Sequence, residues 1–184
     1  MATLSTTAWV LHELGLAAGF GGNLFGQLAL SPAVRAAESK QDRGKIEHVA
    51  WSRYKAVSGA SLLAMAGTWL IGRTFLSGRE VGRASRVLTL AKDVLVAGAV
   101  VSGIGSIVVG TLLSKAQKET GFAIEDGSTP APETSPEVAR LQRLVNVFGT
   151  ANIGFQAGVL ATTSMLAMKA GKSTKWSFVS KLLP

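Results

Sequence analysis

The chain has 184 residues, enough for one or at most two domains. It is 47% hydrophobic and only 16% charged, against about 25% in an average soluble domain, so its composition is typical of a membrane protein. The absence of cysteine excludes disulfides, thiolate nucleophiles and cysteine metal ligands. The net charge of +8 comes from basic residues between apolar runs, which fits an anionic phospholipid surface better than nucleic acid.

Four uncharged segments are long enough to cross a hydrocarbon core about 30 Å thick as helices, since a helix rises about 1.5 Å per residue. The strict two-residue alternation of barrel strands is absent from these segments, which favours helices. We therefore predict an all-α fold, a single domain over residues 1–184 built as a bundle of four transmembrane helices. The uncharged segments are residues 14–34, 56–72, 94–113 and 144–168, and the spans are expected at about 10–34, 54–75, 90–113 and 142–168.

The first apolar run contains two amides, Asn23 and Gln27, which share a helix face because they are four residues apart. Gly15 and Gly19 continue that face toward the start of the helix. No Lys or Arg stands in the first eight residues, and no clean small-residue cleavage site follows the run. We expect the run to be a retained span and not a cleaved signal peptide.

The last apolar run repeats the amide pair as Asn152 and Gln156, with the same spacing. In lipid, small residues and amides that bond across helices hold bundles together. We interpret the two pairs as helix-packing contacts, within the bundle or against a partner subunit. A polar pocket for a ligand between the helices is the alternative.

The third apolar run contains small residues at every fourth position, and these are Gly98, Ser102, Ser106 and Gly110. This small-xxx-small pattern over three turns predicts a second surface for close helix packing. A dinucleotide site at "GIG" is excluded because no strand precedes it.

Ionisable residues stand only at the edges of the apolar runs. His12 and Glu13 lie near Trp9, and Lys92 and Asp93 precede the third run, so we expect both pairs to be interfacial. His12 with Glu13 as an ionisable pair at the membrane edge is the alternative. Proton-coupled and ion-driven transporters usually need such residues at mid-membrane, so this pattern does not favour one.

The connections between the runs differ in character. Residues 35–55 contain six Lys or Arg and no proline, which favours a helix that continues into the second span. Residues 114–138 contain "GFAIEDGSTPAPETSPE" and are expected to form an exposed loop. A helix is predicted to start after it, with Ser135 as N-cap and Pro136 in the first helical position.

The tail, residues 169–184, is basic and partly amphipathic. We expect it to lie on anionic lipid, and docking to a partner subunit is the alternative. Lys and Arg number nine on the side of the termini and ten on the other, so we place both termini in the cytoplasm because of the acidic, proline-rich third loop. The candidate lipid-surface residues are Lys172, Lys175, Trp176 and Lys181.

No catalytic residue, cofactor site or metal site is predicted. "HELGL" lacks the second histidine of a zinc-protease helix, and "AGKS" lacks the first glycine of a phosphate loop. We expect a non-catalytic accessory or stabilising subunit of a larger membrane complex, with other membrane subunits as partners. A small channel or carrier for a neutral or lipidic substrate is the alternative.

The Ala-, Val- and Gly-rich spans and the "GSTPAPETSPE" loop resemble those of small four-span membrane proteins from high-GC actinobacteria. These include an accessory subunit seen with Mce-type lipid transporters. The resemblance covers layout and composition, and no functional residue carries over. It implies a partner complex that handles lipids at the bacterial inner membrane, in which this chain stabilises or tunes the permease.

Overall fold

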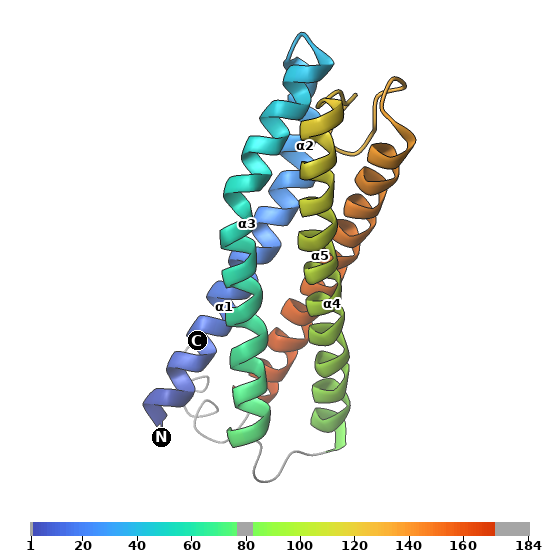
Figure 1. Cartoon of the computed structure of the whole chain (residues 1–184). Coiled ribbons are helices and arrows are strands. Elements are labelled where there is room, and N and C mark those ends of the chain that lie inside the picture. Colours follow the sequence, from blue (N-terminus) through green and yellow to red (C-terminus); the bar gives the residue numbers. More distant parts are fainter. Residues whose placement is uncertain (1, 77–82, 172–184) are drawn as a thin grey trace, which may run out of the picture.

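The computed structural model describes residues 2–76 and 83–171, and it is all-α. Helices make up 88% of this part of the chain, which contains no β-strand. Four long helices run up and down in succession, so α1 begins at the same end of the bundle at which α5 finishes (Figure 1). They are α1 (Ala2–Phe25), α3 (Lys40–Ile71), α4 (Arg83–Thr120) and α5 (Pro136–Gly171).

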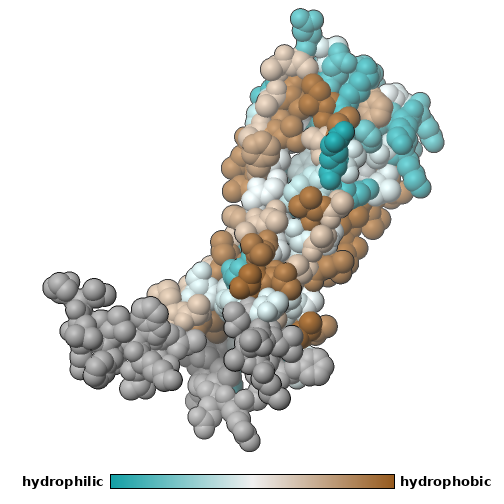
Figure 2. Space-filling view, turned by 90° about the vertical axis from the view of Figure 1, so that its left-hand side faces the viewer, coloured by the Kyte–Doolittle hydropathy of each residue, from teal (hydrophilic) through white to brown (hydrophobic). Residues whose placement is uncertain are grey.

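Two of these helices are long and apolar enough to cross a membrane. Among the described residues, the stretches that qualify are Arg86–Thr120 in α4 and Pro136–Met168 in α5. On the face that Figure 2 presents, hydrophobic residues cover much of the bundle, and hydrophilic residues gather at the end where α3 begins. The all-α prediction is confirmed, and both the third and the fourth predicted spans lie within helices of membrane-spanning length.

The first predicted span is divided among several helical segments. After α1, a π-helical turn η1 (Gly26–Leu30) is followed by α2 (Ser31–Ala33) and a 3-10 turn η2 (Val34–Ala36). Pro32 lies two residues after the end of the π-helical turn and has no backbone N–H to donate into it. Regular α-helical bonding therefore cannot continue from α1 through this proline.

The predicted helix start at Ser135 is confirmed, and so is a helical connection into the second apolar run. The connection after Pro32 is helical from Lys40 through the second apolar run, and Ser39 caps this helix by accepting a hydrogen bond from the Asp42 backbone N–H at 3.0 Å. At the start of α5, the Ser135 hydroxyl accepts from the Val138 N–H at 3.4 Å, and Pro136 takes the first position. After Ile71, a second π-helical turn, η3 (Gly72–Leu76), ends this part of the chain.

The loop before α5 is shorter and less exposed than the sequence predicts. Helix α4 continues to Thr120, and Gly121 then turns the chain with a φ of 102°, a value that favours glycine. Ile124, Asp126 and Ala131 of the loop are buried. The expectation of an exposed loop is wrong for these residues, because the loop packs back onto the end of the bundle.

The helices pair as two antiparallel hairpins, α1 with α3 and α4 with α5, and contacts between the hairpins are much sparser. One hydrophobic core joins the hairpins, with residues from all four long helices: Leu16, Met65, Val96, Ala99 and Val159. Away from this core the two hairpins separate, and this separation creates the site described next.

Candidate functional site

A cleft of about 350 Å³ lies between the two hairpins, on the loop side of the core. All four long helices contribute to its wall, and Gly127 and Ser128 of the loop lie at its end. Half of its lining residues carry a side-chain amide or hydroxyl within a surface that is mostly apolar, and they are Asn23, Gln27, Ser31, Ser52, Tyr54, Ser58, Ser106, Ser114, Gln117, Ser128, Gln142, Asn146 and Thr150. Leu28, Ile107, Leu113 and Val145 add apolar surface.

Small residues leave room for the cleft. Gly110 lies on its wall, and a Cβ atom added there would meet no heavy atom within 4 Å. Ser106, one turn earlier, lines the same wall. The second half of the predicted ridge in α4 therefore faces the cleft rather than a packed helix.

The first half of that ridge packs against α5. A Cβ on Gly98 would lie 2.5 Å from the Phe155 ring, so glycine allows this ring to approach. Ser102 is buried, and its hydroxyl accepts a hydrogen bond from Asn152 Nδ2 at 3.2 Å. The first half of the ridge thus packs against α5, and the second half forms part of the cleft wall.

Three of the four predicted amides meet at the floor of the cleft. Asn23 Nδ2 donates to Asn152 Oδ1 at 2.9 Å, which joins α1 to α5. Gln156 Nε2 donates to the same oxygen at 2.9 Å, and Asn152 Nδ2 donates to the Ala99 carbonyl at 2.7 Å. Asn152 and Gln156 are buried beneath the cleft, whereas Asn23 lines it.

The fourth amide, Gln27, lies higher on the cleft wall. Its Nε2 donates to Thr150 Oγ1 at 3.3 Å across the α1–α5 contact, in an exposed position. The two remaining predicted glycines lie on the far side of the floor, where Gly15 contacts the α3 backbone and Gly19 lies against Gln156.

Charged and aromatic side chains of α3 line the loop side of the cleft. Glu47 accepts from Trp51 Nε1 at 3.1 Å, and Lys55 Nζ donates to Thr111 Oγ1 of α4 at 2.6 Å. Burial raises the pKa of Glu47 to about 7, with a smaller contribution from the negative charge of Asp126. Glu47 therefore changes charge near neutral pH inside the cleft.

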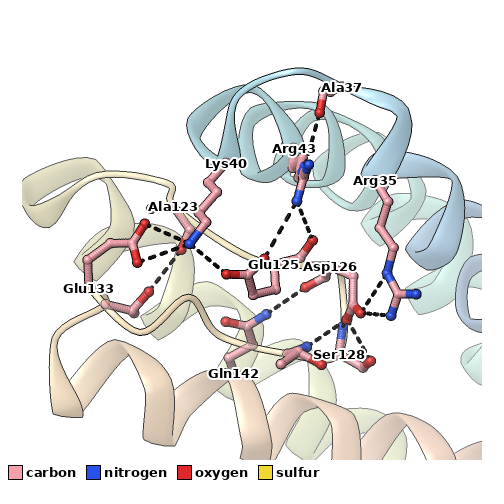
Figure 3. A network of polar contacts seen from close by, with 12 residues as sticks. Arg35, Ala37, Lys40, Arg43, Ala123, Glu125, Asp126, Ser128, Glu133 and Gln142 are labelled. Carbon is pink, nitrogen blue, oxygen red and sulfur yellow. Dashed lines mark hydrogen bonds and ion pairs between the residues drawn. The ribbon is translucent and has the colours of Figure 1, made fainter.

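A polar network fastens the loop over this end of the cleft (Figure 3). Asp126 accepts hydrogen bonds from the Arg35 guanidinium and, at 2.8 Å, from the backbone N–H groups of Ser128 and Thr129. Burial alone would raise the pKa of Asp126, but these bonds outweigh it and hold that pKa well below its usual range.

Ion pairs from the start of α3 complete the attachment. Lys40 Nζ lies 2.6 Å from Glu125 and 3.2 Å from Glu133, and these two carboxylates raise the pKa of Lys40 (Figure 3). Arg43 donates to the Glu125 carbonyl at 3.2 Å. The basic start of α3 and the acidic loop are more than 80 residues apart in the sequence, and together they form one closed end of the bundle.

A second polar cluster, which sequence reasoning missed, lies at the other end of the bundle. Lys92 is fully buried within the bundle, which the sequence does not predict, and His12 is buried in the same cluster. The position of both residues relative to a membrane interface stays a prediction. Asp93 pairs with Arg73 at 2.9 Å. A signal was present in the sequence, since Trp9 stands three residues before His12 on the same helix face.

The four predicted lipid-surface residues of the tail lie outside the described residues. No group of three or more metal-ligating side chains occurs within the described part of the chain. Comparisons with protein families, with characterised proteins and with solved structures found no match to this chain. The arrangement of the cleft itself is therefore the basis for a functional proposal.

Proposed function

We propose that this chain is a membrane-embedded binding or carrier protein for an uncharged, hydroxyl-rich group. The group is either a small polyol or sugar, or the headgroup of a neutral lipid. The observation that carries this proposal is the cleft between the hairpins, with amides and hydroxyls from all four long helices on its wall. Its volume of about 350 Å³ is within the range of small-molecule sites.

The chemistry of the lining supports an uncharged ligand. Hydroxyl and amide groups can each donate and accept hydrogen bonds, as ligand hydroxyls also do. Among the described residues that line the cleft, Glu47 and Lys55 are the carboxylate and the ammonium group, and Lys55 is already bonded to Thr111. Trp51 and Tyr54 add aromatic surface for the apolar face of a sugar ring or for the start of an acyl chain.

We further propose a four-span arrangement in a bacterial cytoplasmic membrane, with both termini in the cytoplasm. The lengths and apolar faces of α4 and α5 support it, as do the large exposed apolar side chains of α1, η1 and α3, among them Phe25, Leu28, Leu63 and Leu70. Labelling single cysteines from outside tests the orientation. Residue 128 should react and residue 173 should not, and the reverse pattern would contradict it.

An accessory role in a larger complex, including a lipid transporter, stays a prediction. The features that suggested it have partners within the chain, because Asn152 bonds to Asn23 and Ser102, and Gly98 contacts Phe155. We therefore place ligand binding first. Gentle affinity purification with mass spectrometry tests the accessory role, which requires a stoichiometric second subunit.

Ligand binding is tested by the thermal stability of the purified protein in detergent, with probes added one at a time. The probes are free glucose, glycerol, a monoglucosyl diacylglycerol and phosphatidylglycerol. A ligand that binds only the folded state raises the melting temperature as its concentration rises. We expect a rise with an uncharged hydroxyl-bearing probe and none with phosphatidylglycerol. Comparing the rise in melting temperature with glucose and with the glucolipid shows whether the cleft binds a free sugar or a lipid headgroup.

Two glycine variants locate the binding. Gly110→Phe should fill the cleft and abolish the rise, because open space surrounds that position. Gly154→Phe is the matched control, since Gly154 is exposed on α5, also has open space around it, and does not line the cleft. Equal responses of both variants, or no response of the wild type to any uncharged probe, would contradict the proposal.

A further inference from the structure

Three buried polar atoms without hydrogen-bond partners belong to the polar cluster at the end of the bundle away from the cleft. They are His12 Nε2 and Glu13 Oε1 of α1, and Lys92 Nζ of α4. A buried polar atom without a partner destabilises the folded state, and a buried charge without a partner destabilises it more. Three such atoms in one cluster indicate a site for a small molecule, such as water, that can form hydrogen bonds with them.

Lys92 is held by aromatic rings instead of by hydrogen-bond acceptors. Its side chain is 0% exposed, and Nζ lies 4.3 Å from the centroid of the Trp69 ring and 5.3 Å from that of Trp9. Ring faces attract an ammonium group but accept no conventional hydrogen bond from its three protons. The three ammonium protons of Lys92 are therefore available to donate hydrogen bonds to another group.

The hydrogen bond of His12 fixes which of its ring nitrogens faces this site as an acceptor. Nδ1 lies 2.8 Å from the Met65 carbonyl oxygen, which can only accept, so Nδ1 carries the proton. In the neutral ring, Nε2 then has a free lone pair. Nε2 and Glu13 Oε1 are thus two acceptors that complement the ammonium donor of Lys92.

We propose that Lys92, His12 and Glu13 form a hydrated proton-binding site inside the bundle. Water bridges the Lys92 ammonium to the two acceptors, since it can donate and accept in the same small space. On deprotonation, Lys92 gives one proton to this water, which passes it to solvent, and the neutral amine takes one back at lower pH. The site therefore exchanges a proton between the bundle interior and the solution.

The charged groups around Lys92 come from three helices. Helix α1 brings His12 and Glu13, and α4 itself brings Asp93. From η3, directly after α3, the Arg73 guanidinium pairs with Asp93, with Nη2 to Oδ2 at 2.9 Å. Trp69 Nε1 of α3 donates to the same carboxylate at 2.8 Å. Helix α5 has no charged residue between Arg143 and Lys169. Asp93 is therefore already paired, and among the described residues Glu13 is the carboxylate whose negative charge acts on Lys92.

This site is separate from the cleft. His12 and Asn23 are eleven residues apart on α1, or about 16 Å along the helix axis. The hydrophobic core of Leu16, Met65 and Val96 lies between the two levels. The proposal of a proton site therefore does not depend on whether the cleft binds a ligand.

Fluorescence of the two indole rings beside Lys92 tests the proposal directly. In a Trp51→Phe, Trp176→Phe background, Trp9 and Trp69 are the only tryptophans left. Protein in detergent, without any cleft ligand, is titrated from about pH 5 to about pH 11, which covers the usual range of His and Lys. Loss of the ammonium charge next to both rings should change their emission in one titration step.

Variants of Lys92 decide the outcome. Lys92→Met and Lys92→Gln should each abolish the step, because neither side chain titrates. Lys92→Arg should also abolish it, because arginine keeps its charge throughout this range. Near-UV circular dichroism confirms that each variant is folded. Lys118→Met, at an exposed position of the same helix, should leave the step unchanged, as should Gly110→Phe in the cleft. A flat wild-type titration, or a step that survives in a folded Lys92 variant, would overturn the proposal.

Discussion

Asn152 is the side chain through which three helices are joined. Its Oδ1 accepts from Asn23 of α1 and from Gln156 of α5, and its Nδ2 donates to the Ala99 carbonyl and the Ser102 hydroxyl of α4. A buried amide with all these bonds is stabilising only while its partners remain in place. Removing it leaves several buried polar groups unsatisfied at once.

We expect Asn152→Leu to lower the free energy of unfolding by about 2–3 kcal/mol, because it leaves the Asn23 and Gln156 amides without an acceptor. Gln27→Leu should cost less than about 1 kcal/mol, because its bond to Thr150 is long and exposed. Unfolding titrations in mixed micelles measure both. Equal losses from the two variants would contradict a central role for Asn152.

A second prediction at the residue scale concerns Glu47. Because its folded pKa is raised to about 7 from an ordinary 4.5, the folded protein binds a proton there that the unfolded chain has lost. Stability contributed by protonated Glu47 is therefore full below about pH 4.5 and is lost as pH rises through 7. We expect this loss to amount to roughly 1–3 kcal/mol.

Glu47→Gln should remove this loss, so that the difference in stability between variant and wild type grows between about pH 5 and pH 7.5. Thermal melts across this range measure the effect. Glu119→Gln, at an exposed position, is the control and should follow the wild type. A pH profile of Glu47→Gln parallel to that of the wild type would show that Glu47 titrates normally.

At the scale of the helices, the α1–α3 hairpin depends on the close approach of Gly15 in α1 to the backbone of α3. A Cβ atom on Gly15 would lie 2.8 Å from the Ser61 carbonyl oxygen and 3.0 Å from the Met65 nitrogen, both backbone atoms of α3. Backbone cannot move aside as a flexible side chain can. The hairpin keeps its spacing only while position 15 has no side chain.

We expect Gly15→Ala to destabilise the protein by about 1–3 kcal/mol through this clash. Gly21→Ala on the same helix is the control, because an added Cβ there meets nothing within 4 Å and alanine favours helix by up to about 1 kcal/mol. Thermal or denaturant unfolding distinguishes them. A Gly15→Ala protein as stable as Gly21→Ala would mean that α1 and α3 are not so close.

Helices and their starts could be predicted because their signals are local. Ser135 stands directly before the helix that it caps, and apolar runs of span length mark the helix interiors. Ser39 caps α3 in the same way, although this cap was not predicted from the sequence. The docking of the loop by Asp126 depends on Arg35, a partner 91 residues away along the chain. Spacing within one segment contains no information on such partners.

The same limit applies to both polar sites. The helical spacing of Asn23 and Gln27 predicted a shared face, but not that Asn23 would reach Asn152 while Gln27 would meet Thr150. Lys92 adjoins an apolar run and therefore looked interfacial. Its burial follows from the packing of Trp9 and Trp69 around it, which only the three-dimensional arrangement brings together.

For the whole molecule, the arrangement implies a division of roles along the bundle. A closed polar end carries the loop network, the cleft lies beneath it, and the core separates the cleft from the Lys92 cluster. The sparse contacts between the hairpins allow the cleft to exist, whereas each hairpin is tightly packed within itself. The central claim is that polar solvent or ligand enters a bundle whose outer surface is apolar.

Thiol accessibility in native membranes tests this claim most directly, since the chain has no cysteine of its own. Ser106→Cys places a thiol on the cleft wall, and Ile104→Cys places one two residues away on an exposed apolar position of α4. We predict that a charged, water-soluble methanethiosulfonate reagent modifies Ser106→Cys and leaves Ile104→Cys unmodified. An unreactive Ser106→Cys, or equal modification of both, would contradict a polar cleft inside a membrane-embedded bundle.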